Sequence, residues 1–528
     1  MSHIKKAIGV LLTMALLILP LGAAFPAQAA SDAPILRIRG ENTLFWASPE
    51  GVATPLYDDG EYVSAVAKAA LPLAIPALIT GNWDKWSDAA WEQLKPAYDH
   101  YKPDAEGNVP ADTWINFSEL NSVPYRMSCD TVEFSYEFFP DMRVSPMDAA
   151  DEIHETVERI KALHGADKIT LIGQCMGNAY MLAYLNKYEA PRGYAGIEAV
   201  VYSTTTANGL PDEDRLFSGT IRFDLESAYR ALGNYELPAE LAGMAGGMLL
   251  DLIYDTLDLA YQAKGLGKLT VGVVQNVYDK VKVPFIARVL REYYGRCGGY
   301  VSSVTEHYEE YKDYVFPTEQ DRQTYETQIA KFDDYYYNVQ QRQPEMIRDM
   351  QAAGVTVASI AEYGVQNGYP TGGEAALETS DGRVPVSRSS FGATGCRIGQ
   401  TLPEDYVASR VSYGFADYIS PDGQVDASTG LLPETTWYIK NAPHAFDRPV
   451  MALATAIVKT PGATVERLRE QGWARFLWYT DGNTPLRPLT AEDTDAAQVV
   501  TPKTPNAFRA FFRWIKTLFR LIGQLLKR

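Results

Sequence analysis

The sequence predicts an α/β protein in which helices cover a mostly parallel sheet and a large helical insertion interrupts the sheet-forming core. A β-like run at Phe134–Phe139, a helical segment after Ser145 and a second β-like run at Lys168–Ile172 follow one another. This is the order of a parallel strand–helix–strand unit. From about Gly209 to Pro370 the apolar residues recur mainly with helical spacing, which predicts the insertion.

Composition agrees with a globular protein and excludes one class of partner. The 528 residues are 46% hydrophobic and 22% charged. A chain of this length is enough for one large core with insertions, or for two domains. The net charge of −18 argues against nucleic acid as a partner of the body of the protein, because nucleic-acid binding depends on basic surface.

The N-terminus has the layout of a secretory signal peptide. Lys5 and Lys6 precede an apolar run, Ala7–Leu19, and Ala27–Ala29 forms a small-x-small cleavage site. The apolar run ends at Pro20 without a basic flank, which favours a cleaved signal over a retained anchor. We therefore expect a secreted or extracytoplasmic protein.

The helix before the second strand has start and stop signals. Ser145 is suited to the N-cap, Pro146 to the first turn and Asp148 to the capping-box position, and Gly165 ends the helix. Helical spacing predicts one buried face, made by Ile153, Val157, Ile160 and His164.

The strand at Lys168–Ile172 leads into Gly173-Gln174-Cys175-Met176-Gly177 and then into helix-forming residues. A strand, a G-x-nucleophile-x-G turn and a helix make a nucleophile elbow, in which the glycines at 173 and 177 leave room for a tight turn. The central residue is usually serine and is cysteine here. The elbow predicts that Cys175 is a nucleophile; the alternative is a small buried core residue.

A base and an acid are expected after the elbow, in the order nucleophile, acid, histidine. Of the six histidines, only His444 follows both the elbow and the late β-like run at Thr436–Lys440. Asp381, in a turn after the strand around Val355–Tyr363, is the predicted acid. A solvated loop histidine and a structural Asp-Gly turn are the alternatives.

The four cysteines are too few for a disulfide scaffold, and no pattern of cysteines or histidines suggests zinc. We expect neither a metal nor a cofactor. If Cys175 is set aside, one bridge and one free thiol are compatible with the other three, and the sequence does not decide the pairing among Cys129, Cys297 and Cys396.

The C-terminal tail, Lys503–Arg528, differs in composition from the rest of the chain. It contains seven Lys or Arg and no Asp or Glu, and its apolar residues follow helical spacing. A basic amphipathic helix suits an anionic membrane surface. The alternative is that the tail docks against the acidic body of the same protein.

Three segments together resemble the lecithin:cholesterol acyltransferase-like branch of the α/β-hydrolases, which also includes lipases. They are Pro140–Pro146, the elbow, and Ser380–Pro385 ("SDGRVP"). The resemblance implies an α/β-hydrolase fold with a helical cap and a Cys175–His444–Asp381 triad. It also implies that the early strand ending at Gly40 supplies an oxyanion donor, from the backbone N–H of Glu41 or Asn42 beside that of Met176.

The elbow departs from the pattern of this family at three positions: Gln174 replaces histidine, Cys175 replaces serine and Asn178 replaces a common glycine. The first and third are interpreted as flanking changes that leave the mechanism intact. The second changes the intermediate to a thioester. Polyhydroxyalkanoate synthases have a similar G-x-C-x-G elbow, but their substrates are intracellular thioesters, whereas this chain carries an export signal.

The expected function is therefore a secreted acyl-ester hydrolase or acyltransferase that acts on esters with an acyl chain, such as lipids. One alternative is a non-catalytic envelope-associated protein that binds a lipid or glycan, and a more remote one is a polyhydroxyalkanoate-synthase-like polymerase. The expected organisation is a signal peptide, a first part of the core, a helical cap, a second part of the core and a basic C-terminal helix, at 1–29, 30–208, 209–354, 355–500 and 501–528.

Overall fold

The structure is a computed structural model that describes most of the chain between Ala33 and Asp493. The predicted signal peptide, Cys129 and most of the predicted C-terminal helix lie outside the described residues. The described residues are 33–40, 44–47, 53–55, 69, 72–74, 76–77, 79–99, 102–110, 113–115, 125–126, 135–227, 255–256, 258–260, 262, 264–367, 377–444, 446–493, 509, 512–513 and 515–517.

The core of the described part is a nine-stranded sheet whose seven central strands run parallel, with an antiparallel strand at each edge. This confirms the predicted class, an α/β protein with a mostly parallel sheet. The strands, in order across the sheet, are β14 (Arg487–Pro488), β13 (Phe476–Trp478), β12 (Thr436–Lys440), β9 (Thr356–Tyr363), β8 (Ile197–Ser203), β7 (Ile169–Gln174), β1 (Ile35–Ile38), β6 (Ser135–Phe138) and β5 (Tyr125–Arg126).

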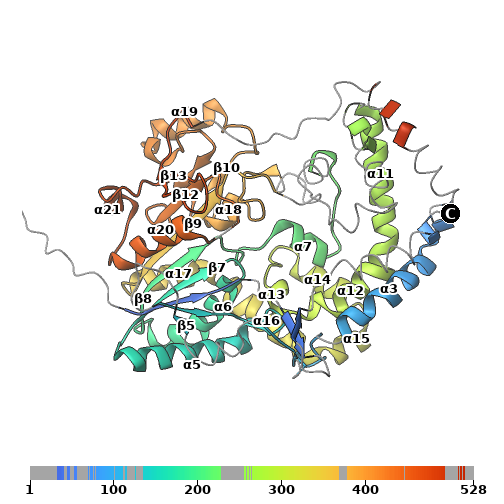
Figure 1. Ribbon diagram of the computed structural model, residues 1–528, viewed down its shortest axis with the longest axis horizontal. Coiled ribbons are helices and arrows are strands. Elements are labelled where there is room, and N and C mark those ends of the chain that lie inside the picture. Colours follow the sequence, from blue (N-terminus) through green and yellow to red (C-terminus); the bar gives the residue numbers. More distant parts are fainter. Residues whose placement is uncertain are drawn as a thin grey trace, which may run out of the picture.

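Helices cover both faces of this sheet (Figure 1). Leu171 of β7 joins an apolar cluster with α5 (Pro146–His164), whereas the next residue, Ile172, joins a second cluster with α20 (Arg448–Lys459). Successive side chains of a strand point to opposite faces, so a strand buried on both sides reads as a continuous apolar run. Ile169–Ile172 fits this pattern except for the buried Thr170.

Helix α5 confirms most of the predicted signals. The Ser145 side chain accepts a hydrogen bond from Met147 N, and Gly165 ends the helix with a left-handed φ of 60°. The predicted capping-box role of Asp148 is wrong, because its carboxylate lies 2.8 Å from Lys331 Nζ. A charged partner from a distant helix competes successfully with the local backbone N–H. In the predicted buried face, Ile153, Val157 and Ile160 are fully buried and His164 is half-buried.

The described elements between β8 and β9 are helices, which agrees with the helical periodicity of this region. An earlier helix, α3 (Asp84–Asp99), packs against them through Trp86, whose ring centroid lies 5.3 Å from that of Phe285. The helices between the strands are α7 (Pro211–Phe217), α11 (Lys264–Val281), η3 (Lys282–Ile286), α12 (Ala287–Glu292), η4 (Tyr294–Arg296), α13 (Gly298–Val301), α14 (Tyr308–Val315), α15 (Glu319–Thr324), α16 (Glu326–Tyr335), η5 (Tyr336–Gln340) and α17 (Gln343–Ala352).

Smaller elements surround the main sheet. A three-stranded sheet and a two-stranded sheet are separate from the main sheet. Short helices occur in the connections from β7 onward. The sheets are β3 (Ala53–Pro55) with β2 (Leu44–Ala47) and β4 (Thr113–Ile115), and β10 (Thr394–Gly395) with β11 (Val425–Asp426); the helices include α6 (Gly177–Tyr184), η1 (Leu185–Glu189), η2 (Ala190–Arg192), α18 (Val386–Ser389), α19 (Glu404–Ser412), η7 (Ala416–Tyr418), η8 (Ala427–Thr429) and α21 (Val465–Arg469).

The few described residues of the C-terminal tail contact the body of the protein. Arg513 forms an ion pair with Asp255 and a second one, at 3.5 Å, with Asp258. The Thr517 hydroxyl donates a hydrogen bond of 2.6 Å to Asp255. These contacts support the alternative in which the tail docks against the acidic body, and binding of the tail to a membrane stays a prediction.

Candidate active site

Cys175 lies in the turn between β7 and α6 and has a left-handed φ of 51°. A left-handed conformation costs a non-glycine residue roughly 1–2 kcal/mol, so the surroundings have to hold it in place. One restraint is the N–H of Cys175, which donates a hydrogen bond of 3.1 Å to Ser203 O at the end of β8. The turn has the strained strand-to-helix geometry of a nucleophile elbow.

The two elbow glycines have the packing role that the sequence predicted. A Cβ on Gly177 would lie 2.2 Å from Ile38 O and 2.4 Å from Arg39 O. A Cβ on Gly173 would lie 2.3 Å from the side-chain oxygen of Asn178. The start of α6 therefore lies directly against the end of β1.

Replacing Gly177 by alanine is expected to destabilise the protein by about 2–3 kcal/mol, because two backbone carbonyls would have to move. Gly272→Ala in α11 is the matched control: its Cβ would meet no atom within 4 Å, so we expect stabilisation of about 0.5–1 kcal/mol. Urea unfolding of both variants measures the difference. Equal stability of the two variants would contradict the close packing of the elbow.

The backbone after β1 reaches the cysteine. A Cβ on Gly40 would lie 2.9 Å from Cys175 Cβ and 3.5 Å from Cys175 Sγ. The predicted donors Glu41 and Asn42 follow directly in the chain but lie outside the described residues. The other predicted donor, the N–H of Met176, has no hydrogen-bond acceptor among the described residues. It can therefore receive an oxyanion.

Asp381 and His444 form a pair. His444 Nδ1 lies 2.8 Å from Asp381 Oδ2, and His444 N donates a hydrogen bond of 2.8 Å to Asp381 O. The other carboxylate oxygen of Asp381 accepts from the N–H groups of Arg383 and Val384, at 2.8 and 2.6 Å. Asp381 is 1% exposed. A fixed, buried carboxylate of this kind selects the tautomer of the imidazole.

The charge of the site favours an imidazolium. Burial lowers the pKa of the His444 imidazole, but the charges of Cys175 and Asp381 raise it by more, so that this pKa lies well above its ordinary value. The Nε2 atom of His444 is buried and has no hydrogen-bond partner among the described residues. The Cys175 thiol is nonetheless close enough to the imidazole to raise its pKa. Such contacts are often loose in a free enzyme and tighten with substrate.

The structure thus brings the three residues of the predicted triad together from distant parts of the chain. Cys175 follows β7, Asp381 lies in the loop after β9, and His444 follows β12. These strands and β8 are neighbours in the sheet. Ligands of open α/β sheets bind at the carboxyl ends of the strands, which is where all three residues lie.

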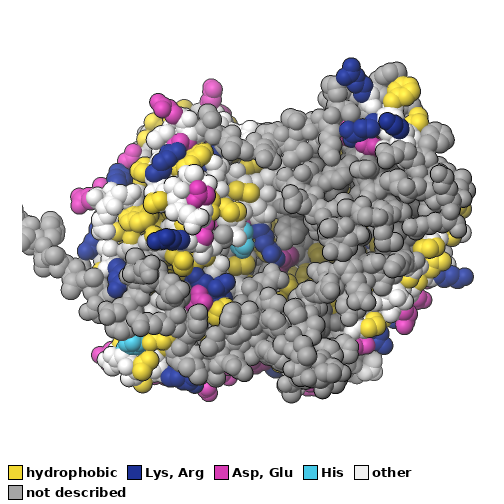
Figure 2. Space-filling view, viewed as in Figure 1, with side chains coloured by type: hydrophobic (Ala, Val, Ile, Leu, Met, Phe, Trp, Pro, Cys, Tyr) yellow, Lys and Arg dark blue, Asp and Glu magenta, His cyan; other side chains and the backbone are white. Residues whose placement is uncertain are grey.

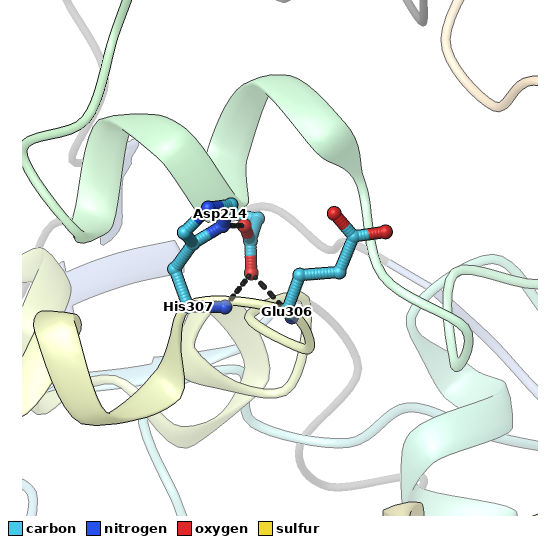
Figure 3. Close-up of side chains that lie close together, drawn as sticks. All are labelled: Asp214, Glu306 and His307. Atoms are coloured by element: carbon cyan, nitrogen blue, oxygen red, sulfur yellow. Dashed lines mark hydrogen bonds and ion pairs between the residues drawn. The ribbon is translucent and has the colours of Figure 1, made fainter.

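A second Asp–His pair lies in the helical region and resembles the first (Figure 3). Asp214 contacts His307 Nδ1 with one oxygen and accepts from the backbone N–H groups of residues 305–307 with the other. Glu306 lies within reach of both but forms an ion pair with Arg388. Because these groups have partners within the chain, we interpret the cluster as a structural link between α7 and the loop before α14, and not as a metal site.

Charged residues beside the acid were not singled out from the sequence. Arg383 lies 3.0 Å from the buried Glu213 of α7, so the loop that carries Asp381 is tied to the helical region. Burial raises the pKa of the Glu378 carboxyl to about 7, although hydrogen bonds from the backbone N–H and the hydroxyl of Ser387 lower it. No local sequence signal distinguishes these two acids, since their roles depend on contacts with other segments.

The remaining described cysteines, Cys297 and Cys396, are free and buried. The Cys297 thiol donates to Tyr293 O and the Cys396 thiol to Gln400 O. Burial raises the pKa of the Cys297 thiol, which makes it a poor nucleophile. The pairing of Cys129 lies outside the described residues.

Described side chains also form open cavities. Figure 2 shows a hollow near the centre of one face, with hydrophobic, basic and acidic side chains around it. One cavity, of about 580 Å³, lies beside α18 and the start of α17. It is lined by Ala207, Asn208, Thr305, Glu306, Gln340, Gln341, Gln343, Pro344, Ser387, Arg388, Phe391, Gly392 and Leu431, so that Cys175, Asp381 and His444 do not border it.

Comparison of the chain with models of protein families and with curated proteins gave no match. In the part of the chain that the structure describes, no helix is both long and apolar enough to cross a membrane.

Proposed function

We propose that the chain has an α/β-hydrolase fold and is a secreted acyl-ester hydrolase or acyltransferase with a Cys175–His444–Asp381 triad. The observation that carries the proposal is the hydrogen-bonded Asp381–His444 pair, whose imidazole lies beside a cysteine held at φ 51° in a strand-to-helix turn. The order along the chain, nucleophile, acid, histidine, is that of α/β-hydrolases. The strand order across the sheet supports the same fold.

The proposed reaction has two steps. The thiol proton moves to His444 Nε2, the sulfur attacks the ester carbonyl, and the N–H of Met176 stabilises the oxyanion. The C–O bond breaks and His444 returns the proton to the leaving alcohol, which leaves an acyl-thioester on Cys175. Water or a second alcohol then loses a proton to His444 and attacks the thioester carbonyl. The C–S bond breaks, the acyl group leaves as the acid or the new ester, and His444 returns the proton to the sulfur of Cys175.

The preference for lipid esters rests on the resemblance to acyltransferases and lipases; a membrane role of the basic tail, which in the described residues contacts the body of the protein, would add to it. A non-catalytic lipid- or glycan-binding protein on the same fold is the alternative class. It has no need of a histidine held by a buried acid beside the cysteine, and for this reason we favour the enzyme.

The test is release of 4-nitrophenolate from 4-nitrophenyl esters with acyl chains of two to sixteen carbons. We expect turnover by the wild-type protein and none above background by Cys175→Ala, with the chain-length profile reporting the acyl preference. If the folded wild-type protein hydrolyses none of the esters faster than Cys175→Ala does, but binds lipid vesicles, the non-catalytic alternative is correct.

A further inference from the structure

Asn178 is the one departure in the elbow region that the structure connects directly to the nucleophile. It follows Gly177 in the first turn of α6 and its side chain is fully buried. Its amide Nδ2 donates hydrogen bonds to Cys175 O at 2.8 Å and to Ser203 O at 3.1 Å. Both acceptors are backbone carbonyls that belong to the turn or to the end of the neighbouring strand β8.

These bonds close a ring around the nucleophile. The N–H of Cys175 donates to Ser203 O, and the backbone N–H of Asn178 also donates to Cys175 O, both at 3.1 Å. The peptide groups on both sides of Cys175 are thereby held, which fixes its φ and ψ and so the direction of its Cα–Cβ bond. Thr204, the residue that follows β8, is itself left-handed, with φ 43°. Two strained residues are thus joined through one amide.

The orientation of the amide is determined by its neighbours. If Nδ2 and Oδ1 were exchanged, an oxygen would face two carbonyl oxygens, which is repulsive. In the observed orientation Oδ1 is buried, makes no hydrogen bond and lies against Gly173. The amide nitrogen therefore makes two hydrogen bonds, while the amide oxygen has no donor among the described residues. Because this oxygen would lie 2.3 Å from a Cβ at position 173, the arrangement requires glycine there.

We infer that Asn178 is a positioning residue that holds the Cys175 thiol toward His444, an inference that rests on the proposed function. From the sequence alone this replacement of glycine is expected to be neutral, whereas the contacts show that the Asn178 amide supports the backbone of the nucleophile. Glycine at 178 offers no side-chain donor, so the elbow of this chain has a restraint that a glycine would lack.

The test is the pH dependence of Cys175 alkylation by iodoacetamide, quantified on the Cys175 peptide by mass spectrometry. In the wild-type protein we expect a rate that stays high down to about pH 6, because a thiolate is paired with the imidazolium. In Asn178→Ala the profile is expected to move toward that of an ordinary thiol, near pH 8.5. Once the midpoint of the profile lies above pH 6, each further unit lowers the rate at pH 6 roughly tenfold. The turnover number kcat for esters should fall with KM unchanged.

Two further variants make the test specific. In Asn178→Ser the hydroxyl can still donate to the carbonyl three residues earlier, so this variant should lie between wild type and Asn178→Ala. Asn186→Ala removes a similar amide, which donates to Asn338 O at 3.0 Å, and should leave the profile unchanged. If Asn178→Ala does not fold, the profile of Asn178→Ser decides.

The outcomes separate the two proposals. A wild-type profile without the acidic plateau contradicts the Cys175–His444 pair and with it the proposed function. A plateau that persists in folded Asn178→Ala, or in Asn178→Ser where that variant has to decide, overturns the inference about Asn178 alone.

Discussion

His444→Ala is expected to lower ester turnover by at least about 10²–10⁴-fold, the typical contribution of a general acid–base group, and by up to about 10⁶-fold when the nucleophile, base and acid act as one unit. The reason is that no other described group lies where it can accept the thiol proton and return it to the leaving alcohol. The same variant should lose rapid alkylation of Cys175 below about pH 7, because the imidazolium partner of the thiolate is gone. Stopped-flow turnover and alkylation rates measure both effects.

His307→Ala is the matched control, since His307 also contacts a buried aspartate but lies in the helical region. Its turnover should equal that of the wild type.

The free energy of unfolding of the wild type should exceed that of His444→Ala by an amount that decreases as pH rises. The pKa of His444 is raised in the folded protein, so the imidazole contributes stability that is complete below about pH 6.5 and is lost as pH rises through the raised pKa. Turnover by His444→Ala close to that of wild type would remove His444 from the proposed triad.

Asp381→Asn is expected to lower turnover by about 10⁴-fold while the protein stays folded, as for the corresponding change in serine proteases. The amide oxygen can still accept from the N–H groups of Arg383 and Val384, which keeps the loop in place. Its NH₂ group would then face His444 Nδ1 and favour the tautomer with a proton on Nε2. That tautomer cannot accept a proton from Cys175. Activity and circular dichroism together measure this effect.

Asp214→Asn is the control for this change, because Asp214 has the same arrangement of one oxygen on backbone N–H groups and one on a histidine. We expect turnover to stay at the wild-type level. If Asp214→Asn lowers turnover as much as Asp381→Asn does, the two effects are structural and the assignment of Asp381 fails.

The sheet and the three residues of the candidate site could be predicted from the sequence for two physical reasons. A G-x-C-x-G turn between a strand and a helix is a local signal, readable from one short segment. Parallel strands bring their carboxyl ends to one edge of the sheet, so residues after the strands that end at Gln174, Tyr363 and Lys440 had to lie near each other.

What the sequence did not predict depends on contacts between distant segments. The sequence predicts a capping-box role for Asp148, but its carboxylate pairs with Lys331. Asn178 was interpreted as neutral, because its importance comes from Ser203 O on another strand. The packing of α3 against the helices before β9 likewise joins segments far apart in the chain, for which no local pattern gives a signal.

The most direct test of the central claim is the mass of the intact protein after brief incubation with an activated ester, followed by peptide mapping. The proposed mechanism predicts an increase equal to one acyl group, located on the Cys175 peptide and labile to hydroxylamine, as a thioester is. The adduct should be absent in Cys175→Ala and should accumulate when the second step is slowed at low pH. An acyl group on any other residue, or none on correctly folded wild-type protein across a panel of esters, would contradict the account.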